Sequence, residues 1–317
     1  MDKQAVRDRF QGCMLGLAIG DALGYPTEFL SLSAIRARFG RDGVTDFASA
    51  GSLPPGSYSD DTQMSLAVAR GLASASNCLD DAEQVIGSIC REFVVWLDTE
   101  ALADPRAPGN TCLTGCRALK RGLPWREAGV RESKGCGAAM RTAPIGLVYH
   151  QRPELLREVA NGASACTHAH PTGVAAGIAT AWLTALALAG DIDDMVGKLL
   201  EFVGDVSDEF NDKMRQVQTV LGREPDDAFA VLGEGWIGEE AVAGALYCFL
   251  RSPDDFAATV RAGANTQGDS DSIACIAGAL SGAYNGITRI PEPWVQGVER
   301  TKVLADMARR LLAIATA

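Results

Sequence analysis

The sequence has few of the signals that mark β-strands, disulfide frameworks or secreted proteins. No run of alternating β-branched and polar residues predicts a strand, and no two of the nine cysteines have the C-x-x-C spacing. Most of the cysteines stand among apolar neighbours, which is typical of buried free thiols in a reducing compartment. Residues 1–8 are charged and contain no apolar segment of the kind that signal peptides have. We therefore expect a cytoplasmic protein.

Positive charge is also scarce. The formal net charge is −11 and no block of Lys and Arg occurs, so the backbone of a nucleic acid is not expected as a strong partner. A long uncharged stretch, 168–190, contains His, Pro and Thr besides several Gly and Ala. We interpret it as a buried helix and expect no membrane partner. The negative net charge still allows a nucleotide ligand whose phosphates are bound by backbone N–H groups and metal.

Helical periodicity runs along most of the chain. Val6, Phe10, Met14 and Leu17, for example, share one face of a helix. Pro and Gly separate such segments, but no long linker and no repeat of solenoid period divides them. The sequence therefore predicts an all-α fold of about a dozen helices, with residues 1–317 forming a single compact domain.

Three of the expected helices, 12–24, 171–190 and 273–286, consist mainly of Ala, Gly and other apolar residues. Small side chains let helix backbones approach closely, and a helix that is apolar on every face is normally buried. We expect these three helices at the centre of the bundle.

Two acidic segments, 59–62 and 268–272, each stand directly before an apolar helix although they are far apart in the chain. Helix capping is one explanation, since Ser59 and Asp269 are good N-caps and acidic residues favour the first turn of a helix. The fact that both segments precede helices of low polarity favours a second explanation, in which they meet around divalent metal.

Four carboxylates brought together without Lys or Arg would repel one another strongly at low dielectric. A cation is the simplest remedy, and ligands that are all oxygen suit Mg²⁺ or Mn²⁺ and suit zinc poorly. This number of carboxylates is enough for two ions, roughly 3.5–4 Å apart in a two-metal site. The candidate ligands are Ser59, Asp60, Asp61, Asp269, Asp271 and Ser272.

Three further segments are candidates for a ligand cleft. The Gly-Asn-Thr turn at 109–111 offers backbone N–H groups to a phosphate, although such turns cap helices in many proteins. The small-residue loop 134–141 allows a ligand to approach the main chain, or else a tight helix crossing. His168 precedes the Ala-rich helix, either as a core residue or in a pocket. Glu28 follows a Pro-containing turn, either as an exposed residue or as a group near the metal.

The motifs 12–24 with Glu28, 59–64 and 268–272 together resemble the ADP-ribosylglycohydrolase family, and the resemblance covers nearly the whole chain in the same order. It implies an orthogonal multi-helix bundle with a binuclear Mg²⁺ or Mn²⁺ centre at the base of a cleft. The reaction that it implies is hydrolysis of the bond at the C1″ carbon of ADP-ribose.

The resemblance also assigns roles to residues. The six oxygen ligands named above become ligands of two ions, with Ser59 and Ser272 in place of the family's usual Thr, and Glu28 becomes a mobile acid beside them. The catalytic residues are then Glu28, Asp60 and Asp271. The residues implied for the diphosphate, distal ribose and adenine are Gly109, Asn110, Thr111, Gly135, Cys136, Gly137, Ala138, Met140 and His168.

Two positions depart from the family pattern. Cys136 stands in the glycine loop where Asn is expected, and Ala107 stands where arginine-directed members commonly have Asp. The second departure puts arginine specificity in question and leaves the metal chemistry intact. We expect the acceptor to be recognised by loops near 41–58, 98–110 and 207–238.

The expected function is metal-dependent release of ADP-ribose from a modified acceptor, which is a protein side chain, a nucleic-acid base or an O-acyl adduct. The expected partner is thus ADP-ribose or an ADP-ribosylated macromolecule, bound by a monomer. A metal-dependent phosphohydrolase of dinucleotides or nucleoside-diphosphate sugars is the first alternative, distinguished by its product. A non-catalytic, crystallin-like relative is the second, and the intact aspartates argue against it.

Overall fold

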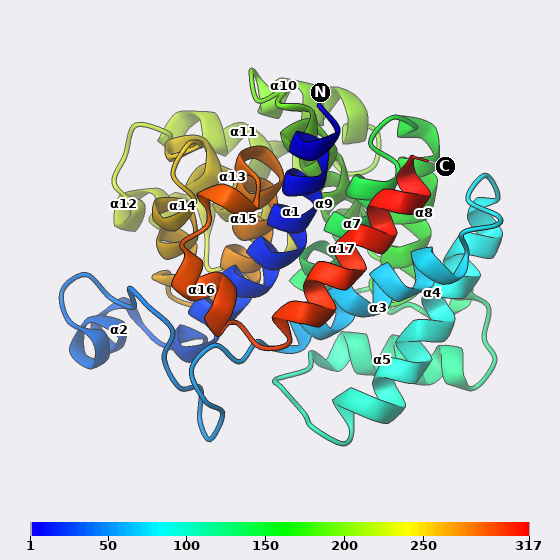
Figure 1. The fold of residues 1–317 in the computed structure, drawn as a ribbon, viewed down its shortest axis with the longest axis horizontal. Helices are drawn as coiled ribbons and strands as arrows, with labels where there is room; N and C mark the ends of the chain where they lie inside the picture. The colour runs from blue at the N-terminus through cyan, green and yellow to red at the C-terminus, as the bar shows by residue number, and fades with distance from the viewer. Residues whose placement is uncertain (1, 317) are drawn as a thin grey trace.

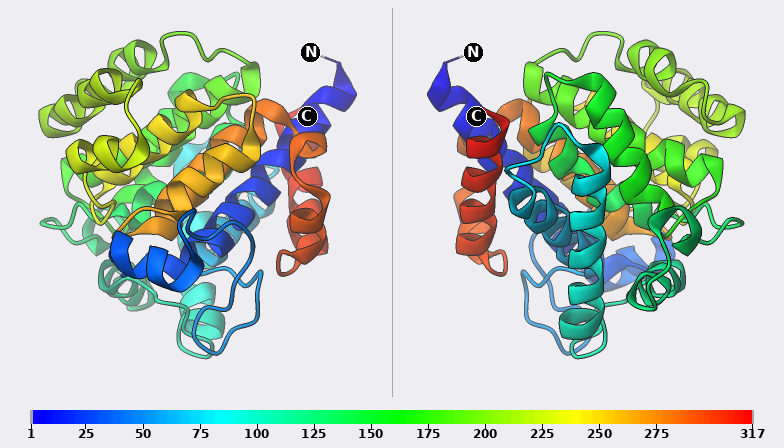
Figure 2. Two further views of the ribbon diagram at one scale, coloured as in Figure 1. Left: turned by 90° about the vertical axis from the view of Figure 1, so that its left-hand side faces the viewer. Right: turned by 90° about the vertical axis from the view of Figure 1, so that its right-hand side faces the viewer.

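A computed structural model describes residues 2–316, which form helices and contain no β-strand (Figure 1). The all-α prediction is confirmed. The views in Figure 2 show helices that cross one another in several directions, as in an orthogonal bundle. The α-helices are α1 (Lys3–Gly24), α2 (Leu32–Phe39), α3 (Asp60–Ser74), α4 (Ala82–Trp96), α5 (Asn110–Lys120), α6 (Trp125–Ala128), α7 (Ala143–Val148), α8 (Pro153–Ala165), α9 (Pro171–Ala189), α10 (Met195–Val203), α11 (Asp208–Val220), α12 (Pro225–Leu232), α13 (Gly238–Arg251), α14 (Phe256–Ala264), α15 (Ser270–Asn285), α16 (Glu292–Gly297) and α17 (Thr301–Ala315).

Short helical segments of other kinds connect them. The 3₁₀ helices are η1 (Tyr25–Thr27), η3 (Cys136–Arg141) and η4 (Ile287–Arg289), and the π-helical turn η2 (Leu97–Ala101) continues α4. The estimate of about a dozen helices was too low, because the described residues form seventeen α-helices. Helices as short as α6 and α16 span fewer than two turns, so they leave no periodic pattern in the sequence.

Helices α1 and α15 form the centre of the fold, packed against each other in antiparallel directions (Figure 1). Glycines spaced four residues apart on α1 face the backbone of α15. A Cβ atom at Gly16 would overlap the carbonyl oxygen of Gly278, and one at Gly20 would overlap that of Ala274. The spacing of four places these glycines on one side of the helix. The close contact brings the end of α1 to the start of α15, where a Cβ atom at Gly24 would lie 2.5 Å from the Asp271 Cα.

Helix α9 is the third central helix and packs against α7, α8, α13 and α15. By length and composition it is the one helix within residues 2–316 that is apolar enough to cross a membrane, but 89% of its most apolar window is buried inside the protein. The prediction of a buried helix is therefore confirmed. All three predicted central helices lie in the core.

Candidate metal centre

A buried aspartate of α1 holds the start of α3 in place. Asp21 is fully buried, and its Oδ1 accepts a hydrogen bond from the Ser59 backbone N–H at 2.8 Å. Its Oδ2 accepts from the Thr62 N–H at 3.0 Å and from the Thr62 hydroxyl at 2.5 Å. Unpaired N–H groups at a helix N-terminus need such acceptors. Asp21 thus fixes the turn that carries Asp60 and Asp61.

Ser59 is the N-cap of α3, as its residue type predicts. Its Oγ accepts a hydrogen bond from the Asp61 N–H at 3.2 Å. A second anchor comes from the loop between η2 and α5, because the Asp60 N–H donates to the Arg106 carbonyl oxygen at 3.0 Å. The buried Arg106 side chain also donates to the Tyr58 carbonyl oxygen at 3.1 Å. The first acidic segment is therefore held from both sides.

The second acidic segment begins α15. Asp269 is the N-cap, and its Oδ1 accepts from the Ser272 N–H at 3.3 Å. Gly268, just before it, has φ +91°, a backbone region that residues with a Cβ rarely adopt. This turn lets the Asp269 N–H donate to the Glu234 carbonyl oxygen at 2.8 Å.

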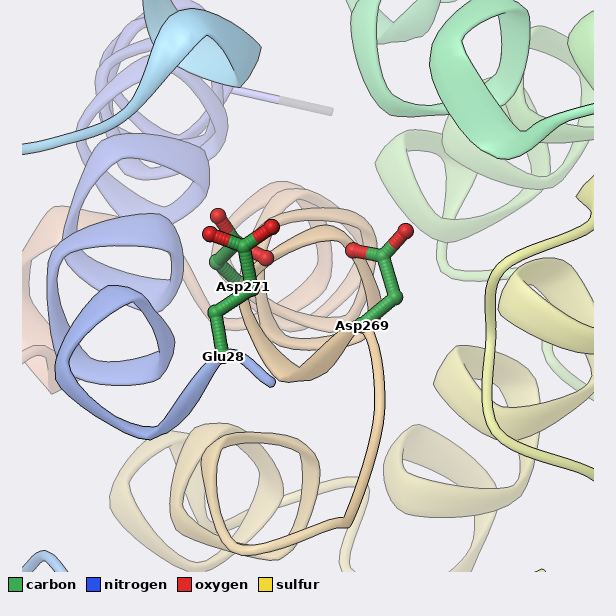
Figure 3. A group of neighbouring side chains, drawn as sticks. All are labelled: Glu28, Asp269 and Asp271. Carbon is green, nitrogen blue, oxygen red and sulfur yellow. The ribbon is translucent and has the colours of Figure 1, made fainter. Parts of the chain in front are cut away.

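The two acidic segments meet directly. The Ser272 hydroxyl donates to Asp61 Oδ2 at 2.8 Å, so the start of α15 touches the start of α3. Glu28, Asp269 and Asp271 each offer a carboxylate oxygen, and these atoms all lie within 4.8 Å of one another. Figure 3 shows the Glu28 carboxylate beside that of Asp271, with Asp269 across the first turn of α15.

Burial and mutual repulsion shape the electrostatics of this cluster. Burial followed by the charges of Asp269 and Asp60 raises the pKa of Glu28 to about 9. Burial and the neighbouring acids likewise raise the pKa of Asp60, Asp61 and Asp271 well above the usual range of a carboxyl. Carboxylates in such a site ionise only when positive charge is supplied.

The donor set fits a hard divalent cation. The described residues that line the cavity include five acids and no Lys or Arg, so no side chain supplies the compensating charge. The donors are carboxylate and hydroxyl oxygens, which Mg²⁺ and Mn²⁺ prefer. An acidic cluster able to hold metal is thus present in this part of the structure.

The cavity above the cluster has a volume of about 360 Å³, within the range of small-molecule sites. Of the residues predicted for metal and ligand, fourteen line it: Glu28, Asp60, Asp61, Gly109, Asn110, Thr111, Gly135, Cys136, Gly137, Met140, His168, Asp269, Asp271 and Ser272. Ser59 and Ala138 do not line it. Ser59 is fully buried as the N-cap of α3, and Ala138 is fully buried within η3. A larger cleft of about 580 Å³ lies between α2, α12 and α14, but no cluster of ligating carboxylates lines it.

Cys136 contacts the cluster through its thiol, which donates to Asp269 Oδ2 at 2.8 Å. Burial and the Asp269 charge raise the pKa of this thiol well above its usual range. The thiol is therefore a neutral donor to a carboxylate, as an Asn side-chain N–H would be. The Cys136 backbone N–H donates to the Trp236 carbonyl oxygen at 3.2 Å, and this bond attaches the glycine loop to the residues just before α13.

Several residues of the site were not predicted from the sequence. Asp21 carried one signal, a lone acid inside an otherwise apolar helix. Phe29 and Trp236 also line the cavity, with stacked rings whose centroids are 5.0 Å apart. Phe29 is 68% exposed, and nothing in its local sequence marks it. Trp236 falls in the segment 207–238, which was expected to be a loop but is helical for most of its length, since α11 and α12 occupy it.

Fold and cleft together define the class of the protein. It is an all-α protein with a cleft whose floor carries buried carboxylates, supplied by the turn after α1 and by the first turns of α3 and α15, and able to hold metal.

Similarity to known proteins identifies the family. A sequence model of the ADP-ribosylglycohydrolase family matches residues 2–317, and the chain belongs to this family of enzymes. It is 34% identical over 313 residues to an uncharacterized protein of Archaeoglobus fulgidus, covering 96% of each chain. It is 29% identical to the ADP-ribosyl-[dinitrogen reductase] glycohydrolase of Rhodospirillum rubrum, covering 99% of this chain and 98% of the relative. Among solved structures it resembles an ADP-ribosylglycohydrolase-related protein complex, with a TM-score of 0.76, 27% identity, and coverage of 98% and 99% of the two chains.

Proposed function

We propose that the protein hydrolyses the C1″ bond of an ADP-ribosyl group on a modified acceptor and releases ADP-ribose. The observation that carries this proposal is the meeting of acids from α3, α15 and the turn after α1 on the floor of one cleft of nucleotide size. Membership of the ADP-ribosylglycohydrolase family supports the reaction class.

Two Mg²⁺ or Mn²⁺ ions would be held by four carboxylates and two hydroxyls, those of Asp60, Asp61, Asp269, Asp271, Ser59 and Ser272. When bound, such ions would act as Lewis acids toward the ribose hydroxyls and the attacking water. Asp269 and Asp61 are already oriented by hydrogen bonds from Ser272. This orientation reduces the rearrangement that binding requires.

Glu28 is proposed as the general base. Within residues 2–316 no hydrogen bond holds its carboxylate, whereas its backbone is fixed by the bond from its N–H to the Gly24 carbonyl oxygen at 3.1 Å. A carboxylate that is free to rotate beside the cluster can take a proton. The oxygen of water forms the new bond at C1″, the proton passes to Glu28, and the acceptor leaves with the bonding electron pair. The remaining carboxylates stabilise the positive charge that develops on the ribose.

The other end of the ligand is proposed to lie along Gly109–Thr111, the loop 135–140 and His168. Helix α5 begins at Asn110, and its first residues line the cavity. Backbone N–H groups at a helix N-terminus suit a diphosphate. Ala107 also lines the cavity. No carboxylate stands at that position to pair with a guanidinium, so we propose that arginine is not the preferred acceptor.

The test is a panel of ADP-ribosylated arginine, serine, thymidine and O-acetyl substrates, assayed with Mg²⁺ and with Mn²⁺ and analysed by chromatography. We expect intact ADP-ribose as the product and the slowest turnover on the arginine adduct. Formation of AMP and ribose phosphate would instead identify a phosphohydrolase. No turnover on any substrate would leave the non-catalytic alternative. We further propose that the protein acts in the cytoplasm as a monomer with one domain. Size-exclusion chromatography at assay concentrations tests whether it is a monomer.

A further inference from the structure

Arg141 is a buried charge that the proposed reaction does not use. It ends η3, is fully buried, and forms no ion pair with any acid in residues 2–316. Its guanidinium stacks over the Phe93 ring, 4.4 Å from the centroid, and its Nε has no partner within the described residues. Burying a guanidinium without an acid is costly. A function that depends on its hydrogen bonds would explain why it is there.

The hydrogen bonds of Arg141 lead toward the cavity. Its Nη2 donates to the Ala163 carbonyl oxygen at 2.8 Å and to the Thr167 hydroxyl oxygen at 2.6 Å. The same hydroxyl lies 2.8 Å from His168 Nδ1. Thr167 therefore stands between the buried cation and the imidazole.

The direction of these bonds follows from the number of protons available. The Thr167 oxygen accepts from Arg141, so its single hydrogen has two possible acceptors. The Ser164 carbonyl oxygen is 3.4 Å away, whereas His168 Nδ1 is 2.8 Å away. The shorter bond favours donation to Nδ1, which places the ring proton on Nε2.

The other ring nitrogen of His168 faces the ligand cavity. The side chain is 2% exposed and lines the cavity, and Nε2 has no hydrogen-bond partner in the part of the chain that the structure describes. The ring lies against the glycine loop. A Cβ atom at Gly137 would stand 3.2 Å from Nε2 and 2.6 Å from the Cys112 sulfur. Nε2 therefore lies close to the backbone of the glycine loop, where Gly135, Gly137 and His168 together line the cavity.

Protonation of this ring is opposed by its surroundings. Burial, and then the charge of Arg141, lower the pKa of His168 to about 3. The imidazole is therefore neutral near pH 7, and its tautomer decides whether it donates or accepts.

We propose that Arg141 is a positioning residue that acts through Thr167 to hold His168 in the Nε2–H tautomer, so that His168 donates one hydrogen bond to an acceptor atom of the bound ligand. This inference rests on the proposed function for the identity of the ligand, in which the diphosphate oxygens are acceptors without a proton.

The tautomer can be measured directly in the ligand-free protein. The chain contains three histidines, so a ¹⁵N-histidine-labelled sample gives three ring patterns, and His168→Gln identifies the one that matters. We expect a pyrrole-like Nε2 and a pyridine-like Nδ1. A pyrrole-like Nδ1 in the unmodified protein would overturn the proposal.

Variants test whether Thr167 and Arg141 set the tautomer. We expect Thr167→Val and Arg141→Met to give a mixture of tautomers, and Thr167→Ser and Arg141→Lys, which keep the donors, to give the single Nε2–H pattern. Thr180→Val is the matched control, since the Thr180 hydroxyl is fully buried and has no partner within the described chain. An unchanged Nε2–H pattern in Thr167→Val overturns the proposal even if Arg141→Met fails to fold.

Ligand affinity gives the second readout. With Mg²⁺ present, we expect Thr167→Val to weaken ADP-ribose binding about tenfold by calorimetry, and to raise KM by the same factor with kcat within about twofold, as loss of one hydrogen bond used in binding predicts. Thr167→Ser should restore both values. Equal affinities in Thr167→Val and Thr180→Val would overturn the proposal. The tautomer is read without turnover, so failure of the hydrolase assignment is distinguishable from failure of this inference.

Discussion

The chain contains two helix starts with nearly the same local sequence and opposite surroundings. Ser59-Asp60-Asp61 begins α3, and Ser207-Asp208-Glu209 begins α11. In both, the serine is the N-cap and its Oγ accepts a backbone N–H at 3.2 Å. Asp60 and Asp61 are buried in the cleft, whereas Asp208 and Glu209 are exposed. The same capping motif therefore lies in a buried cleft at the start of α3 and on the protein surface at the start of α11.

The partners of the acids account for the difference. Lys134 forms an ion pair with Glu209, and the hydrogen bonds from Lys134 and then from the Thr172 hydroxyl lower the pKa of that carboxyl. Asp60 and Asp61 have no basic neighbour in the cavity, and burial raises their pKa. An exposed acid at a helix start is stabilised by the dipole and a nearby lysine. A buried group of acids ionises only when a cation supplies the compensating charge.

The largest contrast between the two helix starts is expected from metal removal. Chelation with EDTA should abolish hydrolysis, and Mg²⁺ or Mn²⁺ should restore it. At an ion concentration 100-fold above Kd, binding should add about 2.7 kcal/mol of stability, measured as a rise in Tm by calorimetry. We expect Asp60→Ala to lose this rise and Asp208→Ala to keep it. Full activity in EDTA would contradict the metal centre.

Substitution of the acids themselves comes next. Asp60→Ala and Asp271→Ala should each reduce kcat/KM by more than about a hundredfold without unfolding the protein, since even partners of metal ligands cost 10–100-fold. Asp208→Ala should stay within about twofold, as exposed substitutions usually do. Circular dichroism checks the fold. Comparable losses in Asp60→Ala and Asp208→Ala would mean that burial does not set the role of these acids.

Asp21 tests the anchor that α3 has and α11 lacks. In Asp21→Asn an amide N–H₂ group faces the donors of Ser59 and Thr62, so the turn that presents Asp60 should shift. We expect activity to fall by about tenfold to a hundredfold. Asp8→Asn on the same helix is the control, since Asp8 accepts only from Gln4 in the described structure. Normal kinetics in Asp21→Asn would show that the turn holds without its anchor.

The contributions of Glu28 and Glu209 to the pH dependence of stability should have opposite signs. The pKa of Glu28 is raised from 4.5 to about 9 in the folded protein, so the folded state retains a proton that the unfolded state has lost. Without metal, this stabilising contribution is full below pH 4.5 and is lost as pH rises to about 9. The pKa of Glu209 is lowered instead, so its contribution is present at neutral pH and lost as pH falls.

Urea titrations at several pH values measure how the free energy of unfolding changes with pH. Glu28→Gln should reduce the decline toward high pH, while the raised pKa values of Asp60, Asp61 and Asp271 keep part of it, and saturating Mg²⁺ should remove the decline in the unmodified protein. Glu209→Gln should leave that decline unchanged. A metal-free stability that rises between pH 5 and 9 would contradict the assignment of a repelling cluster.

The smallest effects are expected at the two caps. Ser207→Ala should cost about 1 kcal/mol of unfolding free energy, the usual value of an N-cap, and leave activity unchanged. Ser59→Ala should cost a similar amount and also weaken Mg²⁺ binding, if its hydroxyl is a ligand as we propose. Equal metal affinity in both variants would restrict Ser59 to capping.

Much of the site could be predicted because its residues carry local signals. Acids that precede a helix of small apolar residues, as at 60–61 and 269–271, predict burial. For the charged segment that follows Asp208 the sequence predicted a loop, and the structure shows α11 there. Phe29, Trp236 and the path from Arg141 to His168 could not be predicted, because the contacts that give them a role join segments distant in the sequence.

The sequence by itself determined the helices, their caps and the small-residue stripe by which α1 and α15 pack, because these depend on neighbours within a few residues. The tertiary structure decided which segments cover the turn at Asp60 and Asp61, and desolvation of these acids depends on that cover. Asp21, Glu28 and Asp269 reach the start of α3 only because glycines let α1 and α15 touch along their length. Through that enclosure the acids at two helix starts become part of a cluster that could hold metal.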